Sequence, residues 1–227
     1  MNKIIDLPIP FGQGMVHLML LQDDTNVILV DSGPIGSIDL ISDALNKHQL
    51  SIDKLTGLVL THHDHDHVGS AAKIKLANPK IKVYASEIES IWITKKEKPL
   101  RQQQAESTLH LVPDSEKEFA HRFISILESL EPVNVDYYLN DGEILPWCGG
   151  VKVISTPGHT PGHISIEIIN ENVVISGDAI VLENHLPAIA NPSFTFNMED
   201  AVKSFDKLMK MDVKTYYCYH GGMYKKS

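Results

Sequence analysis

Four stretches with the character of buried strands are each followed, within one to four residues, by a histidine or an aspartate. The predicted strands and these residues are 55–60 with His62, 151–155 with His159, 173–176 with Asp178, and 215–219 with His220. One buried histidine is more often a core residue, but four such coincidences are hard to explain by packing. Functional sites of α/β proteins are usually built where strands end. The pattern therefore predicts an α/β fold with a site that gathers these side chains.

Residues 60–70, LTHHDHDHVGS, hold four histidines and two aspartates in six consecutive positions. A tract of this kind can be a solvated loop or the remnant of an affinity tag. Its position between a predicted strand and a predicted helix favours a metal site instead. Imidazole and carboxylate ligands without a suitably placed cysteine suit Zn²⁺, with Mn²⁺ and Fe²⁺ as alternatives.

The rest of the pattern predicts two strand-rich halves that flank a helical insert. The other predicted elements are strands at 15–21, 27–31, 82–85 and 164–169, and helices at 38–48 (capped by Ser37), 68–77, 115–130 and 198–211. The helix at 115–130 places Phe119, Phe123, Ile126 and Leu127 on one face. We expect a single domain over residues 1–227, with the insert at about 87–140.

Composition narrows the classes of function. The net charge of −9 argues against nucleic acid and anionic membrane surfaces as partners, because both need clustered Lys and Arg. Two cysteines without a pairing pattern fit a reducing compartment. Pro8 and Pro10 interrupt the N-terminal residues, which do not resemble a signal peptide, and no apolar run reaches membrane-spanning length. We expect a cytoplasmic protein that acts on a small molecule.

The motif THHDHDHVGS resembles the signature T-H-x-H-x-D-H-x-G of the metallo-β-lactamase superfamily. Four supporting motifs occur in the order found in that family: VDSG at 30–33, TPGHTPGH at 156–163, SGD at 176–178 and YHGG at 219–222. The resemblance spans the chain from Asp31 to Gly222. It implies a four-layer αββα sandwich, in which two mixed β-sheets are flanked by helices, with a dinuclear metal site at the edge of the sheets.

The resemblance also implies a set of metal ligands. The first metal would take His62, Asp64 and His159, the second would take Asp66, His67 and His220, and Asp178 would bridge them. Position 64 departs from the family pattern, which usually has histidine there. In an alternative register His63 and His65 form the H-x-H pair, but no spacer then remains before Asp66. Asp31 and His163 would fix the tautomers of the ligands through hydrogen bonds. The alternative is that both are ordinary turn residues at strand ends.

An aspartate at position 64 has a chemical consequence. It lowers the formal charge of the centre by one unit relative to a histidine. A less positive centre lowers the pKa of a bound water less strongly, and the added oxygen ligand makes Mn²⁺ or Fe²⁺ more competitive with Zn²⁺.

These residues predict a dinuclear metal-dependent hydrolase, in which a metal-bridging hydroxide oriented by Asp66 attacks the substrate. Two divalent ions, Zn²⁺ first and Mn²⁺ or Fe²⁺ otherwise, would be its cofactors. The chain lacks several features of the antibiotic-hydrolysing, glutathione-thioester and lactone-cleaving branches. This favours a small stand-alone hydrolase whose substrate is an ester, a thioester, a lactone or a phosphoester.

Two rival functions remain. One is a mononuclear non-haem iron dioxygenase of the same fold, similar to the persulfide dioxygenases, with His62, His159 and Asp178 as ligands. The other is a non-catalytic metal binder. Substrate contacts are expected from the insert and from the loop at 181–197, and ordinary packing or solvent exposure is the alternative for each candidate. The candidates are Trp92, Arg101, His110, Phe119 and Tyr137 in the insert and His185, Phe194 and Phe196 in the loop. No substrate-binding residue and no oligomeric state can be assigned.

Overall fold

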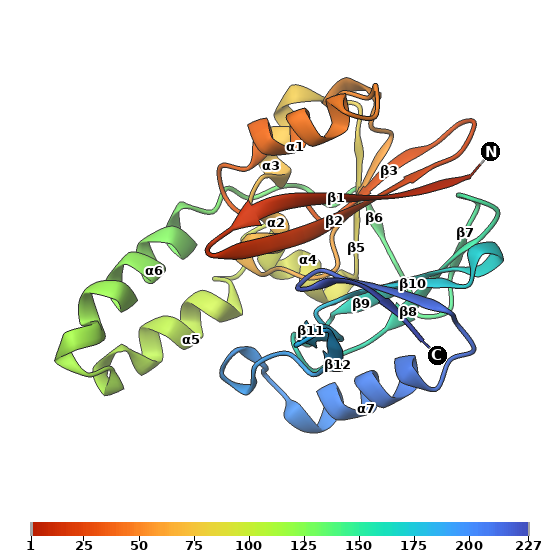
Figure 1. The fold of residues 1–227 in the computed structure, drawn as a ribbon. Coiled ribbons are helices and arrows are strands. Elements are labelled where there is room, and N and C mark those ends of the chain that lie inside the picture. Colours follow the sequence, from red (N-terminus) through yellow and green to blue (C-terminus); the bar gives the residue numbers. More distant parts are fainter. Residues whose placement is uncertain (1, 227) are drawn as a thin grey trace.

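The computed structural model describes residues 2–226 and contains two six-stranded mixed sheets packed face to face (Figure 1). The first sheet has the order β1 (Lys3–Phe11), β2 (Gly14–Gln22), β3 (Val27–Val30), β4 (Gly57–Val59), β5 (Lys82–Ala85) and β6 (Tyr137–Tyr138). The second has the order β14 (Gly222–Lys225), β13 (Thr215–Cys218), β10 (Val173–Gly177), β9 (Ile164–Ile168), β8 (Val151–Ser155) and β7 (Ile144–Leu145). Strands β11 (Val181–Glu183) and β12 (Leu186–Ala188) form a separate hairpin.

Three apolar cores separate four layers. Alternate residues of a strand point to opposite faces, so Leu18 and Leu20 of β2 enter one core and Met19 and Leu21 enter another. The first core lies under helices α1 (Ile38–Asn46) and α3 (Ala71–Ala77), the second lies between the sheets, and the third lies under α7 (Met198–Met209). Figure 1 shows α1 and α3 beside the first sheet and α7 beside the second. The predicted αββα sandwich is confirmed.

Most predicted elements agree with the structure to within three residues, but the N-terminal strand was not predicted. Strand β1 contains Pro8 and Pro10, which pair with His17 and Met15. Because Pro8 and Pro10 are two residues apart, the positions that lack a backbone N–H lie on the same side of β1. Strand β1 is at the edge of its sheet. An edge strand therefore tolerates them. Ser37 occupies the predicted N-cap position of α1, but its side chain makes no capping hydrogen bond to the helix.

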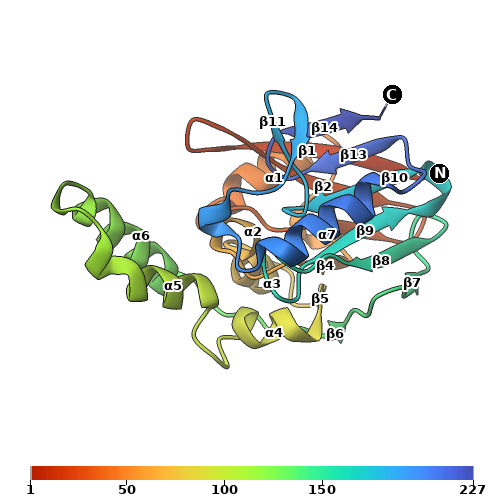
Figure 2. The ribbon, with the colours of Figure 1, turned by 90° about the horizontal axis from the view of Figure 1, so that it is seen from below.

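The insert contains helices α4 (Glu87–Ile93), α5 (Leu100–Thr108) and α6 (Lys117–Ser129), and α5 and α6 project from the sheets as an arm (Figures 1 and 2). Helix α6 buries Ile124 and Leu127, whereas Phe119 on the predicted apolar face is 75% exposed. Short 3₁₀ turns lie at Ile52–Lys54, Leu109–Leu111, Asp114–Glu116, Ile169–Glu171 and Pro192–Phe194. Within residues 2–226, no helix is both long enough and apolar enough to cross a membrane.

The two sheets are joined directly at one edge. Val16, near the start of β2, forms an isolated antiparallel bridge with His220, and the His17 N–H donates to the Tyr219 carbonyl at 3.0 Å. The short helix α2 (His65–Val68) begins close to this junction, because the Tyr219 hydroxyl donates to the Asp66 carbonyl. The histidine-rich segment and the end of β13 are thereby held together.

Candidate metal centre

The loop after β4 and the single turn of α2 turn four side chains of the histidine-rich segment inward. His62 and His67 are fully buried, and Asp64 and Asp66 are 6% and 7% exposed. Backbone hydrogen bonds from His67 and Val68 to the Asp64 carbonyl form the helical turn. The turn places Asp66 and His67 beside His62 and Asp64, although all four come from six consecutive residues.

Strand ends of the second sheet bring three further side chains to the same place, and they complete two ligand groups. His62 and His159 lie near Asp64, with Nε2 atoms 3.8 and 3.1 Å from its Oδ2. In the second group, His220 Nε2 lies 3.3 Å from Asp66 Oδ2, and His67 joins them. Each set offers three ligand atoms within 4.8 Å of one another, as a single ion requires.

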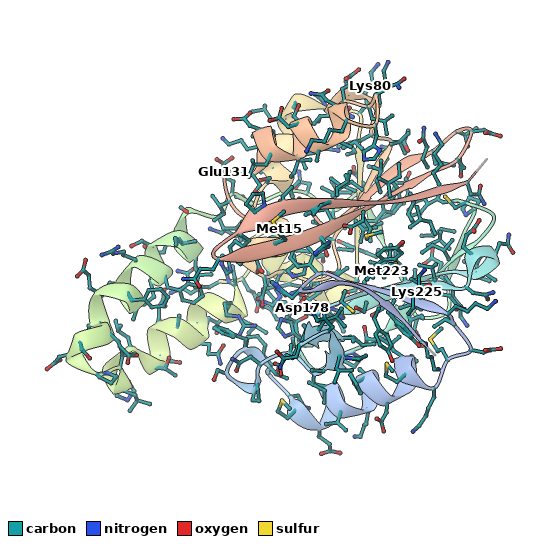
Figure 3. All side chains as sticks on the ribbon, in the orientation of Figure 1. Met15, Lys80, Glu131, Asp178, Met223 and Lys225 are labelled. Carbon is teal, nitrogen blue, oxygen red and sulfur yellow. The ribbon has the colours of Figure 1, made fainter. Side chains whose placement is uncertain are left out.

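Asp178, which follows β10, contacts members of both groups. Its Oδ1 lies 3.3 Å from His67 Nε2, and its Oδ2 lies 3.4 Å from His159 Nε2 and 3.5 Å from His220 Nε2. Figure 3 labels Asp178 on the side of the sheets from which the α5–α6 arm projects. Its two oxygens can therefore serve two ions at once.

Buried hydrogen bonds orient the histidines of the first sheet. Asp31 adopts a left-handed backbone conformation (φ 61°), and its Oδ2 accepts from His67 Nδ1 at 2.8 Å. The Thr61 amide and hydroxyl both donate to Asp31, and Thr61 Oγ1 lies 3.0 Å from His62 Nδ1. Because the Nδ1 atoms are engaged, His62 and His67 present Nε2 to the centre. Asp31 thus lies where the sequence predicted a supporting residue.

His163 supports the centre through the backbone rather than through a ligand side chain. It is fully buried, and its Nε2 accepts the Asp178 N–H at 3.0 Å while its Nδ1 lies 2.8 Å from Thr156 Oγ1. Burial, with a smaller contribution from His159, lowers the pKa of His163 to about 3. The imidazole is therefore neutral and can accept the amide that positions Asp178.

The side chains present the chemistry that a divalent cation needs. His62 Nε2, His67 Nε2 and Asp178 Oδ1 are buried and have no hydrogen-bond partner among the described residues. Buried polar atoms are rarely left in this state. Burial lowers the pKa of His67, but Asp178, Asp31 and Asp66 outweigh it and raise that pKa well above its usual value, so the carboxylates favour positive charge here. The residues fit a metal.

Asp64 has a buried partner that no sequence pattern predicts. Arg101 of α5 is 3% exposed, and it donates from Nη2 to Asp64 Oδ2 at 2.7 Å and from Nε to Oδ1 at 3.2 Å. Burial raises the pKa of Asp64, but Arg101 and then His159 outweigh it and hold that pKa well below its usual value. The guanidinium also lies over the rings of Phe196 and Phe194, at 4.7 and 5.4 Å from their centroids.

This ion pair changes the net charge expected for the metal centre. An aspartate at position 64 lowers the charge of the centre by one unit, but the guanidinium in contact with it adds one back. The pair of Asp64 and Arg101 is therefore close in net charge to the neutral histidine usual in the family. Arg101 is 37 positions away in sequence, in a polar helix with no pattern that points to Asp64.

The two remaining histidines of the segment lie outside the ligand groups. His63 is buried against Glu89 of α4, whose Oε2 lies 2.5 Å from His63 Nδ1 and whose Oε1 accepts from Thr160 and the Gly162 amide. Glu89 thereby connects the histidine-rich segment to the TPGHTPGH loop at 156–163. No sequence pattern predicts this role. His65 faces the rings of Phe11 and Phe123. This geometry supports the assignment in which His62 and Asp64 are ligands, over the alternative register in which His63 and His65 are.

Comparison with known proteins agrees with this architecture. The pattern that defines the metallo-beta-lactamase superfamily matches residues 11–220. The chain belongs to this superfamily. Its sequence is 30% identical to the Bacillus subtilis protein YobT over 83% of this chain and 76% of YobT. It is 28% identical to the probable metallo-hydrolase YflN of the same organism over 72% of this chain, spanning 59% of YflN.

Among solved structures, a metallo-beta-lactamase family protein of Thermus thermophilus is similar. It superposes with a TM-score of 0.75 and 26% identity, over 99% of this chain and 74% of its own. The family predicted from the motifs is therefore confirmed, and with it the enzyme class of a metal-dependent hydrolase of the metallo-beta-lactamase superfamily.

Proposed function

We propose that this metallo-beta-lactamase superfamily enzyme is a dinuclear hydrolase of small esters, thioesters, lactones or phosphoesters. The observation that carries the proposal is the position of Asp178, whose two oxygens face histidines of both ligand groups. Two divalent ions would be held by His62, Asp64 and His159 and by Asp66, His67 and His220, with Asp178 shared. Zn²⁺ is the first candidate because the set contains four imidazoles, and Mn²⁺ or Fe²⁺ follow from the three carboxylates.

The bound ions would make hydroxide available near neutral pH and polarise the carbonyl or phosphoryl oxygen of the substrate. The protein contributes position and proton handling. Asp66 lies 3.3 Å from His220 and is fixed through its backbone by Tyr219, so its carboxylate can orient the attacking water. Water adds to the electrophilic atom, the bond to the leaving oxygen or sulfur breaks, and one water proton ends on the leaving group.

Neighbouring residues keep this arrangement rigid. Thr61 and Asp31 hold the rings of His62 and His67, and His163 holds the amide of Asp178. Misplacing reacting groups by about 1 Å can cost on the order of a hundredfold in rate. Loss of these buried contacts should therefore slow hydrolysis although none of them touches the substrate.

Metal content and activity together test the proposal. Protein purified from metal-depleted medium and titrated with Zn²⁺ is expected to bind two ions per chain and to hydrolyse at least one member of a panel of esters, thioesters, lactones and phosphodiesters. Asp178→Asn keeps the side-chain size and is expected to bind one ion or none. Asp206→Asn, an exposed change on α7, is the matched control. One iron per chain without hydrolysis would instead favour the dioxygenase alternative.

A further inference from the structure

The metal centre opens into a cavity of about 690 Å³, the size of small-molecule sites. One end of the cavity is formed by ligand residues, including Asp64, Asp178 and His220. The remainder lies between the α5–α6 arm, the β1–β2 hairpin and the segment after β10, and apolar side chains form most of its wall: Phe11, Phe119, Phe123, Ile126, Leu182 and Phe194. A molecule held at the metal centre would therefore extend over an apolar surface.

Several of these side chains are exposed although they are large and apolar. Phe119 is 75% exposed, Phe194 is 46% exposed and Ile126 is 44% exposed. Contiguous exposed apolar side chains mark binding surfaces more often than single scattered ones do. Because they share one cavity with the ligand residues, the occupant that fits them is the substrate of the centre.

The charges of the wall give little support to an anionic tail on that substrate. Both arginines in the wall already have carboxylate partners, Arg101 with Asp64 and Arg122 with Glu118. Outside the ligand groups the wall also contains Glu183, which repels anions, and His65, which faces Phe11 and Phe123. An anionic tail would therefore meet no buried, unpaired arginine or lysine among the described residues of this wall, and Arg122 is offered only at its exposed rim.

We propose that this cavity binds the uncharged aliphatic chain of an acyl substrate, with the acyl carbonyl at the metal centre. The proposal rests on the proposed hydrolase function and narrows its substrates to acyl esters, thioesters or lactones with a chain of medium length. Phe119 and Ile126 of α6 and Phe194 of the facing loop are its specificity-determining residues.

The kinetic test uses the full chain loaded with Zn²⁺ and the 4-nitrophenyl esters of acetic, butyric, hexanoic, octanoic and decanoic acids. Burial of each methylene is expected to raise kcat/KM about threefold up to the octanoate, since apolar burial is proportional to area. In Phe119→Ser the ratio of octanoate to acetate kcat/KM is expected to fall about fivefold. Leu76→Ser on α3 is the matched control, since Leu76 is 74% exposed and lies outside the cavity wall.

A binding measurement separates failure of this proposal from failure of the hydrolase function. Titration calorimetry with 2-decanone, which cannot be hydrolysed, is expected to show binding that Phe119→Ser weakens about fivefold and Leu76→Ser leaves unchanged. Binding of 2-decanone without hydrolysis of any member of the ester, thioester, lactone and phosphodiester panel supports the cavity assignment and overturns the proposed hydrolase function. Ester hydrolysis with no dependence on chain length overturns the cavity assignment alone. A Phe119→Ser variant that changes only the oligomeric state also overturns it, because these side chains would then cover a second copy of the chain.

Discussion

The ion pair of Asp64 and Arg101 is the most unusual feature of the centre at the scale of single residues. Both side chains are buried, and Arg101 completes its hydrogen bonds with Gln104 and the carbonyl of Phe194. Removing one partner of a buried ion pair leaves an uncompensated charge, which costs far more than the net contribution of the pair. Asp64 is therefore coupled to the α5–α6 arm as well as to the metal ligands.

Arg101→Ala should lower the free energy of unfolding of metal-free protein by about 3 kcal/mol or more, because Asp64 becomes a buried charge without a partner. Saturating Zn²⁺ should reduce this loss, since a cation beside Asp64 replaces the guanidinium. Urea unfolding with chelator and with Zn²⁺ measures both values.

Arg122→Ala is the matched control for this change. Arg122 is exposed and pairs with Glu118 on the same helix, so its loss should cost no more than about 1 kcal/mol with or without metal. If Arg101→Ala destabilised both forms equally, the guanidinium would be a packing element and not a counter-charge of the centre.

Asp64→His restores the residue usual in the superfamily but should not by itself improve the centre. It leaves the Arg101 guanidinium buried beside a neutral ring, so both Zn²⁺ affinity and stability should fall. The double variant Asp64→His with Arg101→Leu removes that charge and should recover most of both losses, a coupling of about 2 kcal/mol. Competition with a chromophoric chelator measures the affinity, and additive losses would refute the coupling.

At the scale of elements, the TPGHTPGH loop at 156–163 and helix α7 are packed directly against each other. The Asn197 N–H donates to the Gly158 carbonyl at 2.9 Å, and the Asn197 side chain caps α7. Gly158 has φ 133°, and a Cβ placed there would lie 2.1 Å from the backbone nitrogen of Ala201. His159 therefore reaches the centre only because its neighbour has no side chain and α7 can pack against the loop.

Gly158→Ala should destabilise the fold by about 3 kcal/mol and weaken Zn²⁺ binding, since α7 must move away from the His159 loop. The backbone conformation alone would cost about 1 kcal/mol. Gly142→Ala isolates that smaller effect, because Gly142 has φ 78° and no atom lies within 4 Å of an added Cβ. Thermal unfolding distinguishes the two, and equal losses would contradict the packing argument.

The elements of this fold differ in how far the sequence predicts them. Strand ends carrying His62, His159, Asp178 and His220 are predictable because apolar runs and the residues after them are local features. Strand β1 is not, since its prolines are acceptable only at an edge that tertiary structure creates. Likewise the periodicity of α6 predicts an apolar face but not whether that face meets the core or a cavity. The pairing of Asp64 with Arg101 depends on how the arm is placed.

At the scale of the whole molecule, the two cysteines lie in different cores. Cys148 packs between the sheets, and Cys218 packs under α7. Burial, with a smaller contribution from Asp23, raises the pKa of Cys148 to about 11, and burial raises that of Cys218 to about 12. Both thiols are therefore protonated at neutral pH and shielded from reagents.

Neither thiol should react with a disulfide reagent in the native protein at pH 8, because the thiolate is the nucleophile. Both should react after unfolding, so labelling of the native protein should follow opening of the fold. Added Zn²⁺ should slow labelling, since a ligand that binds the native state reduces the unfolded population. Time-resolved labelling measures this, and rapid reaction of one thiol at a rate unaffected by Zn²⁺ would contradict it.

The bridge between Val16 and His220 has a consequence for how the protein acquires its metal. Loops from both sheets must meet before the ligands lie within reach of one another, and contacts between distant parts of a chain form slowly. An unfolded chain therefore offers only the histidine-rich segment, which binds an ion weakly and without the correct partners. Tight uptake should be a late event in folding, and the bound ions would then report that the complete topology has formed.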